Sequence, residues 1–264
     1  MIVVGEKLNC SVPSAYRAFE EMDALFVRNM AMKQESCGAS YIDINAGLFD
    51  DEAEKLIWAS EIVRDASTAR ISIDSANPSS IKRALKGASL SNPLINSISL
   101  EPEKFEGVLE LALEHSASVV ALPIDEGGIP QTEERRIENS VEIVETLHKN
   151  GMPFERIFLD ILIITASVEW DAPIHALNAA RRLREIYPDI HLIAGLSNVS
   201  FGLPKRSFLN HAMLAAAMLA GLDSVIMDIT KEGAVISLAA ANAVTGKDPY
   251  LLGYMKACRD ADLP

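Results

Sequence analysis

Short apolar segments rich in β-branched residues alternate along the whole chain with longer amphipathic segments. The short ones have the length and composition of buried strands, and the long ones carry apolar residues at helical spacing. We predict strands over residues 2–8, 41–46, 70–75, 94–99, 118–124, 157–163, 192–197 and 224–229. We predict helices between them over residues 19–37, 51–67, 78–87, 101–115, 132–150, 173–187, 207–220 and 233–245.

Local signals support several helix boundaries. Asn77 before Pro78 is an N-cap residue followed by a proline in the first turn. Four glycines follow predicted helices at the position where a left-handed backbone ends a helix. They are Gly38, Gly87, Gly151 and Gly221.

Eight strand–helix pairs in 264 residues match a (β/α)8 TIM barrel. An open doubly wound sheet is the alternative, but it usually has fewer strands, and its G-x-G-x-x-G fingerprint is absent. No linker or block of charge divides the chain. We therefore predict an α/β protein with one domain over residues 1–264, a TIM barrel.

Most predicted strands are apolar until their C-terminal ends, where a carboxylate or amide follows. Over residues 70–74, a period of two directs Ile71 and Ile73 toward the helices, so Ser72 and Asp74 face the barrel axis. The carboxyl ends of barrel strands meet at one mouth, where barrel active sites lie. The polar residues at these ends are Asn9, Asp43, Asn45, Asp74, Asn96, Asp125, Asp160, Asn198 and Asp228.

Ordinary structural roles compete with function at several of these positions. Asp125 and Asp228 could equally well cap the next turn or helix. Glu6 and Asp43 could belong to a buried network beneath the site. A common site is favoured for four side chains, because four separate strands would otherwise need the same coincidence: Asp74, Asn96, Asp160 and Asn198.

The segment 194–206 has the densest group of polar residues beside an apolar strand. Gly195 and Gly202 allow close backbone approach or a positive φ. Ser197, Asn198 and Ser200 lie between them, and Arg206 follows. Composition alone leaves both a turn and a binding loop open.

Charge and composition narrow the classes of partner. The net charge of −13, from 24 basic and 37 acidic residues, argues against nucleic acid and anionic membranes. No apolar run approaches the ~20 residues that span a bilayer, and no signal peptide is expected. Three widely spaced cysteines, Cys10, Cys37 and Cys258, fit a reduced compartment, so we expect a cytoplasmic protein.

The polar rim excludes some chemistry and favours one class of ligand. It has no glycine-rich phosphate loop, no Ser/His or Cys/His pair and no metal-ligand spacing among the five histidines, so no metal is expected. Carboxylates and amides suit a flat heterocycle with a donor edge, because a carboxylate accepts two parallel N–H bonds. A pterin presents such an edge through its 2-amino group and N3–H.

Motifs at successive strand ends resemble those of the methyltetrahydrofolate:corrinoid (iron–sulfur) protein methyltransferases. More loosely, they resemble the folate-binding module of cobalamin-dependent methionine synthase. The resemblance covers essentially the whole chain. The motifs are G-E-K-L-N at 5–9, I-D-I-N at 42–45, I-D-S at 73–75, I-N-S at 95–97, L-D at 159–160 and G-L-S-N-V-S at 195–200.

The resemblance implies a pterin-binding barrel, usually a homodimer. Such an enzyme moves a methyl group between N5 of tetrahydrofolate and the cobalt of cobalamin carried by a separate corrinoid protein. Tetrahydrofolate or 5-methyltetrahydrofolate is then the folate substrate. A corrinoid module would offer D-x-H-x-x-G, whereas residues 189–194 end in Ala, so the corrinoid is expected on a partner.

The resemblance also assigns site residues. Asp74, Asn96 and Asp160 match pterin-anchoring positions, Asn198 matches the catalytic asparagine near N5, and Arg206 matches a basic residue of the same loop. Gly195 and Ser197 complete that loop. Phe201 stands where many relatives have a polar residue, so an apolar contact is expected there. The residues expected to support the site are Glu6, Asn9, Asp43, Asn45 and Phe201.

Two other functions remain open. Dihydropteroate synthase is also a pterin-binding barrel, but it expels diphosphate and has an S-R-K-type loop where this chain has S-N-V at 197–199. Its S-T-R-P segment is also missing after residues 43–47. A non-catalytic folate-binding subunit is the other alternative.

Cys10 near the mouth is expected to be inert, because no His or cation neighbours it in sequence.

Overall fold

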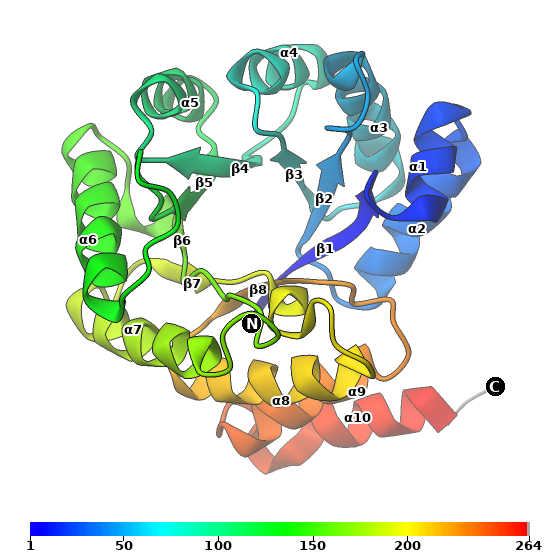
Figure 1. Ribbon diagram of the computed structural model, residues 1–264. Helices are drawn as coiled ribbons and strands as arrows, with labels where there is room; N and C mark the ends of the chain where they lie inside the picture. The colour runs from blue at the N-terminus through cyan, green and yellow to red at the C-terminus, as the bar shows by residue number, and fades with distance from the viewer. Residues whose placement is uncertain (263–264) are drawn as a thin grey trace.

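The computed structural model is a TIM barrel of parallel strands inside a ring of helices (Figure 1). It describes the backbone of residues 1–262 and the side chains of all of these except residues 103, 104 and 262. The strand order β7-β6-β5-β4-β3-β2-β1-β8 confirms the predicted barrel. The strands are β1 (Ile2–Asn9), β2 (Tyr41–Asn45), β3 (Arg70–Asp74), β4 (Leu94–Ser99), β5 (Ser118–Leu122), β6 (Ile157–Asp160), β7 (His191–Ile193) and β8 (Ser224–Met227).

Helices cover the outside of the barrel, and α10 lies against α9 on the outer side of this ring (Figure 1). They are α1 (Pro13–Glu20), α2 (Ala24–Ser36), α3 (Glu52–Ala66), α4 (Pro78–Ala88), α5 (Pro102–Glu114), α6 (Glu133–Lys149), α7 (Ala172–Ile186), α8 (Arg206–Leu219), α9 (Ala234–Val244) and α10 (Leu252–Asp262). Short 3-10 helices are η1 (Phe154–Arg156), η2 (Leu196–Ser200) and η3 (Pro249–Leu251).

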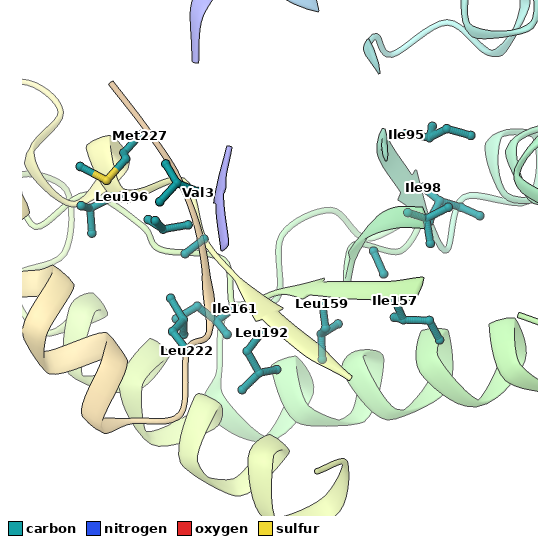
Figure 2. Close-up of a cluster of buried hydrophobic side chains, with 14 of the residues drawn as sticks. Val3, Ile95, Ile98, Ile157, Leu159, Ile161, Leu192, Leu196, Leu222 and Met227 are labelled. Atoms are coloured by element: carbon teal, nitrogen blue, oxygen red, sulfur yellow. The ribbon is translucent and has the colours of Figure 1, made fainter. Parts of the chain in front are cut away.

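The period of two along the strands divides the buried side chains into two cores. Ile71 and Ile73 lie in the outer core between strands and helices, as predicted. Figure 2 shows part of this outer core, including Leu159 and Leu192. A smaller cluster fills the barrel and consists of Val4, Tyr41, Leu94, Val120, Phe158 and Ile193. The polar residues at the strand ends therefore lie above a packed floor.

Backbone hydrogen bonds close the barrel between β7 and β8. The Ile226 N–H donates to the Ala194 carbonyl at 2.9 Å, and the Asp223 N–H donates to the Leu192 carbonyl at 3.3 Å. β7 contains only His191–Ile193, so few ladder bonds are available here.

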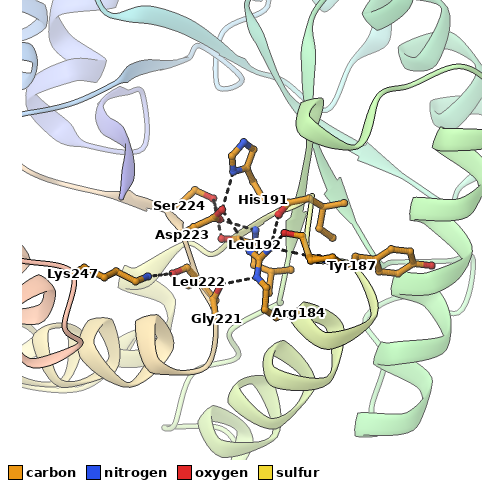
Figure 3. A network of polar contacts seen from close by, with 11 residues as sticks. Arg184, Tyr187, His191, Leu192, Gly221, Leu222, Asp223, Ser224 and Lys247 are labelled. Carbon is orange, nitrogen blue, oxygen red and sulfur yellow. Dashed lines mark hydrogen bonds and ion pairs between the residues drawn. The ribbon is translucent and has the colours of Figure 1, made fainter.

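Side chains strengthen this seam (Figure 3). The Asp223 carboxylate accepts from the Leu192 N–H at 2.9 Å and lies 2.9 Å from Nδ1 of His191. The Ser224 hydroxyl donates to the Leu192 carbonyl at 2.9 Å, and Nη2 of Arg184 lies 3.5 Å from Asp223. Burial opposes the charge on Asp223, but His191 and Arg184 outweigh it and hold the pKa of this carboxyl below its ordinary value.

Two sequence predictions about helices were wrong, and one helix was missed. The helix expected over 19–37 is two helices, because Met22 has a φ of 53° and Asp23 caps α2 by accepting from the Phe26 N–H at 3.0 Å. Gly87 lies inside α4, where a Cβ would come within 2.8 Å of Ile57, so close packing explains it. α10 was not predicted. Gly38, Gly151 and Gly221 do end helices, with φ of 101°, 96° and 109°.

Several predicted strands also extended too far. Residues 161–163 follow β6 but are not part of it, since the chain turns after Asp160 and Leu162 has a φ of 51°. Likewise, β7 ends at Ile193 and the chain continues into η2. Four apolar residues in these segments are buried although they are not strand: Ile161, Ile163, Ala194 and Leu196.

Removing the seam carboxylate should destabilise the fold. Asp223→Ala deletes hydrogen bonds to a charged acceptor, so we expect a loss of about 2 kcal/mol in the free energy of unfolding at pH 7. Because the folded-state pKa of Asp223 is lowered, this stabilisation is present above about pH 4 and lost as pH falls through the folded pKa. Urea unfolding at several pH values measures it, with Asp189→Ala at an exposed position as the control. Equal stability of the two variants at pH 7 would contradict this role.

Candidate active site

Polar side chains from three neighbouring strands form one network at the mouth. Strand register sets Asp43 beside Ser72, Asn45 beside Asp74, and Asp74 beside Asn96. The Ser72 hydroxyl donates to Oδ1 of Asp43 at 2.6 Å, and Nδ2 of Asn96 approaches the same oxygen at 3.4 Å. The structure thus joins two of the predicted pterin-anchoring residues through Asp43, which supports them from below.

The two carboxyls of this network have raised pKa values. Burial raises the pKa of Asp43 well above its ordinary value, and the charge of Asp74 adds to the effect. Burial also raises the pKa of Asp74 to about 6, against hydrogen bonds with Asn45 and Asp43 that lower it. Two carboxyls so close disfavour double ionisation. Asp43 is fully buried while Asp74 is partly exposed, so Asp74 is the more accessible of the two from the mouth.

Asp160 ends β6 and is 9% exposed. Its Oδ1 accepts from the Leu162 N–H at 2.7 Å. Burial raises the pKa of Asp160 to about 6, while the Leu162 hydrogen bond and the positive charge of Arg136 act to lower it. The Arg136 guanidinium is buried and donates to the carbonyl of Ile161 at 2.6 Å and to that of Leu162. Arg136 therefore holds the β6–α7 loop and balances Asp160.

Sequence reasoning missed Arg136. A signal was present, because Arg136 shares the buried face of α6 with Asn139, Ser140 and Ile143. A cation on the apolar face of an amphipathic helix needs a partner in the interior. Here that partner is the loop that carries Asp160.

Asn198 lies in η2, immediately after β7. A Cβ on Gly195 would lie 3.0 Å from its Nδ2, so the glycine gives the amide room to lie over the loop backbone. The side chain is exposed and has no hydrogen-bond partner among the residues that the structure describes. Both functions of the amide, donor and acceptor, are free for a ligand.

Arg206 fixes the shape of the same loop from the start of α8. Its Nη2 donates to the Ser197 carbonyl at 2.7 Å, and its Nε donates to the Ser200 hydroxyl at 3.1 Å. Ser200 in turn donates to Oδ1 of Asn210 at 2.6 Å. The guanidinium also lies 5.9 Å from the centre of the Phe201 ring, which is 67% exposed.

A bulge in β1 directs two successive side chains into the mouth. The β1–β2 register shifts between Gly5 and Leu8, and Oε1 of Gln34 accepts the Lys7 N–H at 3.0 Å. A Cβ on Gly5 would lie 2.5 Å from that oxygen, so only glycine leaves space for Gln34. Both Glu6 and Lys7 consequently line a cavity of about 510 Å³.

This cavity lies between β1, η2, α8 and the segment after β8. Nζ of Lys7 lies 2.9 Å from Oδ2 of Asp228, and the Thr230 hydroxyl donates to Oδ1 of Asp228 at 2.6 Å. Burial raises the pKa of Glu6 and the charge of Asp228 adds to this, while a hydrogen bond with Ser197 opposes it. Glu6 and Ser197 thus connect β1 to the loop that carries Asn198.

Three further positions have mainly structural contacts. Asn9 accepts from the N–H and hydroxyl of Ser11 at 2.9 and 2.7 Å, which forms a turn. Cys10 is buried with its Sγ 3.1 Å from Oδ1 of Asn45, and burial raises the pKa of this thiol. Asp125 accepts from Arg135 at 2.7 Å and thereby fixes the start of α6.

Two observations on the described part of the chain concern metal ions and membranes. Among the side chains that the structure describes, no group of three or more His, Cys, Asp or Glu is arranged to hold a metal ion. Among the helices described, none is both long enough and apolar enough to cross a membrane.

Comparisons with known proteins agree with this geometry. A family model described as "Pterin binding enzyme" matches residues 5–228. The chain is 36% identical over 266 residues to a methylcorrinoid:tetrahydrofolate methyltransferase of Eubacterium limosum, covering 100% of this chain and 98% of that protein. It is 30% identical over 246 residues to methionine synthase of Mycobacterium tuberculosis, covering 88% of this chain and 20% of the much longer relative.

Solved structures of similar shape include dihydropteroate synthases. The enzyme of Xanthomonas albilineans with 4-aminobenzoic acid has a TM-score of 0.72 at 16% identity, covering 94% of this chain and 93% of that one. The enzyme of Coxiella burnetii with pteroic acid has a TM-score of 0.67 at 14% identity, covering 94% of both chains. At these identities the similarity shows the fold alone. The family model and the full-length relative show that this chain belongs to the pterin-binding enzymes.

Proposed function

We propose that this chain is a methyltransferase that moves a methyl group between N5 of tetrahydrofolate and the cobalt of a corrinoid carried by a separate protein. The observation that carries the proposal is the full-length similarity to a methylcorrinoid:tetrahydrofolate methyltransferase. The buried carboxyls at the mouth support it, because they offer acceptors to the donor edge of a pterin.

Asp74, Asn96 and Asp160 are the proposed pterin anchors. Asp74 and Asp160 end β3 and β6, and Asn96 lies in β4 opposite Asp74, so all three are placed toward one mouth. Each carries an acceptor or an amide. Asp160 keeps one carboxylate oxygen engaged with the Leu162 N–H, which leaves the other for the 2-amino group or N3–H of the ring.

Asn198 is the proposed catalytic residue at N5. N5 of methyltetrahydrofolate is a poor leaving group, so positive charge or a proton at N5 must be stabilised as its C–N bond breaks. An amide is not a general acid, but its oxygen can accept from a protonated N5 or orient a water. The free, exposed amide of Asn198 is suited to this role. The corrinoid, when its carrier is docked, supplies the cobalt that exchanges the methyl group.

We propose that the corrinoid protein docks on the apolar rim formed by two mouth loops. Val168 and Trp170 are 80% and 84% exposed, and Phe201 is 67% exposed. The hydroxyls of Thr165 and Ser167 both donate to the Phe201 carbonyl, at 2.7 and 2.9 Å, which joins the two loops. Trp170→Ala should raise the KM for the corrinoid protein about tenfold and leave the Kd for folate unchanged. An unchanged KM would remove Trp170 from the interface.

We further propose that this chain forms a homodimer and that it is cytoplasmic. Exposed apolar side chains on α8, α9 and α10 support a second copy as partner: Leu219, Val244, Leu252 and Met255 are 65%, 71%, 69% and 50% exposed. The free thiols of the cysteines fit a reduced compartment. A monomer in sedimentation equilibrium would contradict the dimer.

The activity itself is tested with purified chain, tetrahydrofolate and a methylated corrinoid protein. We expect the cobalt absorption spectrum to change as the methyl group leaves, with 5-methyltetrahydrofolate formed in equal amount. Folate binding without any spectral change would instead assign a non-catalytic folate-binding subunit.

Asn198→Ala should lower turnover far more than folate affinity. Loss of a contact made at the reacting nitrogen should lower kcat about 100-fold, with less than about a threefold change in Kd. Single-turnover methyl transfer and calorimetry measure the two effects. Asn178→Ala on α7 is the matched control. Normal single-turnover rates in Asn198→Ala would rule out the proposed role.

Asp160→Asn should weaken folate binding. A carboxylate only accepts hydrogen bonds, whereas the amide that replaces it also carries donors, which would face the N–H groups of the pterin. The Kd for folate should therefore rise about 10- to 100-fold. Asp125→Asn removes the same charge from a residue in the loop after β5 and should leave the Kd unchanged. If calorimetry gives Asp160→Asn the wild-type Kd, Asp160 lies outside the site.

A further inference from the structure

The cavity of about 510 Å³ is not lined by the proposed pterin anchors. Its walls come from β1, η2, the first turns of α8 and the segment after β8. It adjoins the loop that carries Asn198, although Asn198 itself is not part of its lining. Ser197, the residue before Asn198, forms part of its wall. The cavity thus has room for a part of the ligand that the pterin anchors do not hold.

Cations outnumber anions around this cavity, although the chain has a net charge of −13. Lys7 is balanced by Asp228 at 2.9 Å. The contacts of Arg206 are neutral, a carbonyl and a hydroxyl. Lys231 has no ion-pair partner among the residues described here. Burial raises the pKa of Glu6, which weakens the remaining negative charge.

Lys231 and His211 lie close together on one side of the cavity. Burial lowers the pKa of His211, and the positive charge of Lys231 lowers it further. The lowered pKa favours the neutral imidazole of His211, whose N–H can donate to an anion, as can the Lys231 side chain next to it. This side of the cavity is suited to a carboxylate.

The other walls are apolar enough to hold an aromatic ring. Val12, Pro13, Leu196 and Met227 line the cavity together with the exposed ring of Phe201. The cavity thus combines an apolar surface near η2 with donors near the segment after β8. The p-aminobenzoyl-glutamate tail of folate matches this order, because it has an aromatic ring followed by carboxylates.

The covalent structure of folate relates this cavity to the proposed pterin site. C6 of the pterin, which carries the p-aminobenzoyl-glutamate tail, is bonded directly to N5. With N5 beside Asn198, the tail leaves the ring next to η2, where Ser197 opens onto the cavity. We propose that the cavity binds this tail, with glutamate carboxylates held by Lys231 and His211. The inference rests on the proposed function.

The test compares tetrahydrofolate with tetrahydropteroate, which has the same rings and no glutamate. Calorimetry should give wild-type chain about a fivefold lower Kd for tetrahydrofolate, as expected for one partly exposed ion pair. Lys231→Ala should bring this ratio close to one without changing the Kd for tetrahydropteroate. Added salt should reduce the wild-type ratio. Lys149→Ala, at the end of α6 and hence at the opposite end of the barrel, should keep the wild-type ratio.

Three results would overturn the inference and leave the proposed function intact. They are equal Kd values for both ligands in the wild type, equal weakening of both in Lys231→Ala, and an unchanged ratio in Lys231→Ala. Binding of inorganic phosphate that depends on Lys231, without any preference for tetrahydrofolate, would assign the cavity to free anions and also overturn it. Failure of both pterins to bind would instead contradict the proposed function.

Discussion

Desolvation of carboxyl groups at the mouth of the barrel is the constraint on which the site depends. Asp43, Asp74 and Asp160 are directed inward by strand register, and burial raises the pKa of each. A buried carboxyl remains acceptable only where hydrogen bonds satisfy it. Ser72 supplies such a bond to Asp43, and the Leu162 N–H supplies one to Asp160. Donors on a ligand would satisfy the remaining oxygens.

The loops around the mouth are fixed by side chains rather than by strand pairing. Arg136 holds the loop after β6, and Arg206 holds the loop after β7. Thr165 connects these two loops through the Phe201 carbonyl, and Glu6 connects the second loop to β1 through Ser197. The free amide of Asn198 is thus carried on a loop that is fixed on both sides, which favours a defined position for this side chain.

The barrel could be predicted from the sequence because its signals are local and repeated. The period of two assigned Ile71 and Ile73 to the outer core and Ser72 to the interior, and the structure confirms both. Strand ends converge in any such barrel, so the sequence also predicted which elements carry the polar side chains to the mouth.

Features that depend on contacts distant in sequence could not be predicted. The β1 bulge requires Gln34 of α2, and the buried position of Arg136 requires the loop after β6. The break between α1 and α2 follows from the capping side chain of Asp23, inside a segment whose apolar pattern continues across it. The cavity beside η2 is formed by segments from both ends of the chain, and one of its two lysines, Lys231, lies in no strand-end motif.

Proton exchange on tetrahydrofolate binding tests most directly whether buried carboxyls hold the pterin. Calorimetry at pH 6, in two buffers of different ionisation enthalpy, measures it. Burial raises the pKa of Asp74 and Asp160 to about 6, so both are partly protonated there before binding. Pterin N–H donors favour the charged form, so binding should lower both pKa values, release protons and tighten as pH rises from 5 to 7. We expect net proton release on binding, and a smaller release in Asp160→Asn. No proton exchange, or net proton uptake, would contradict a pterin held by ionised carboxylates.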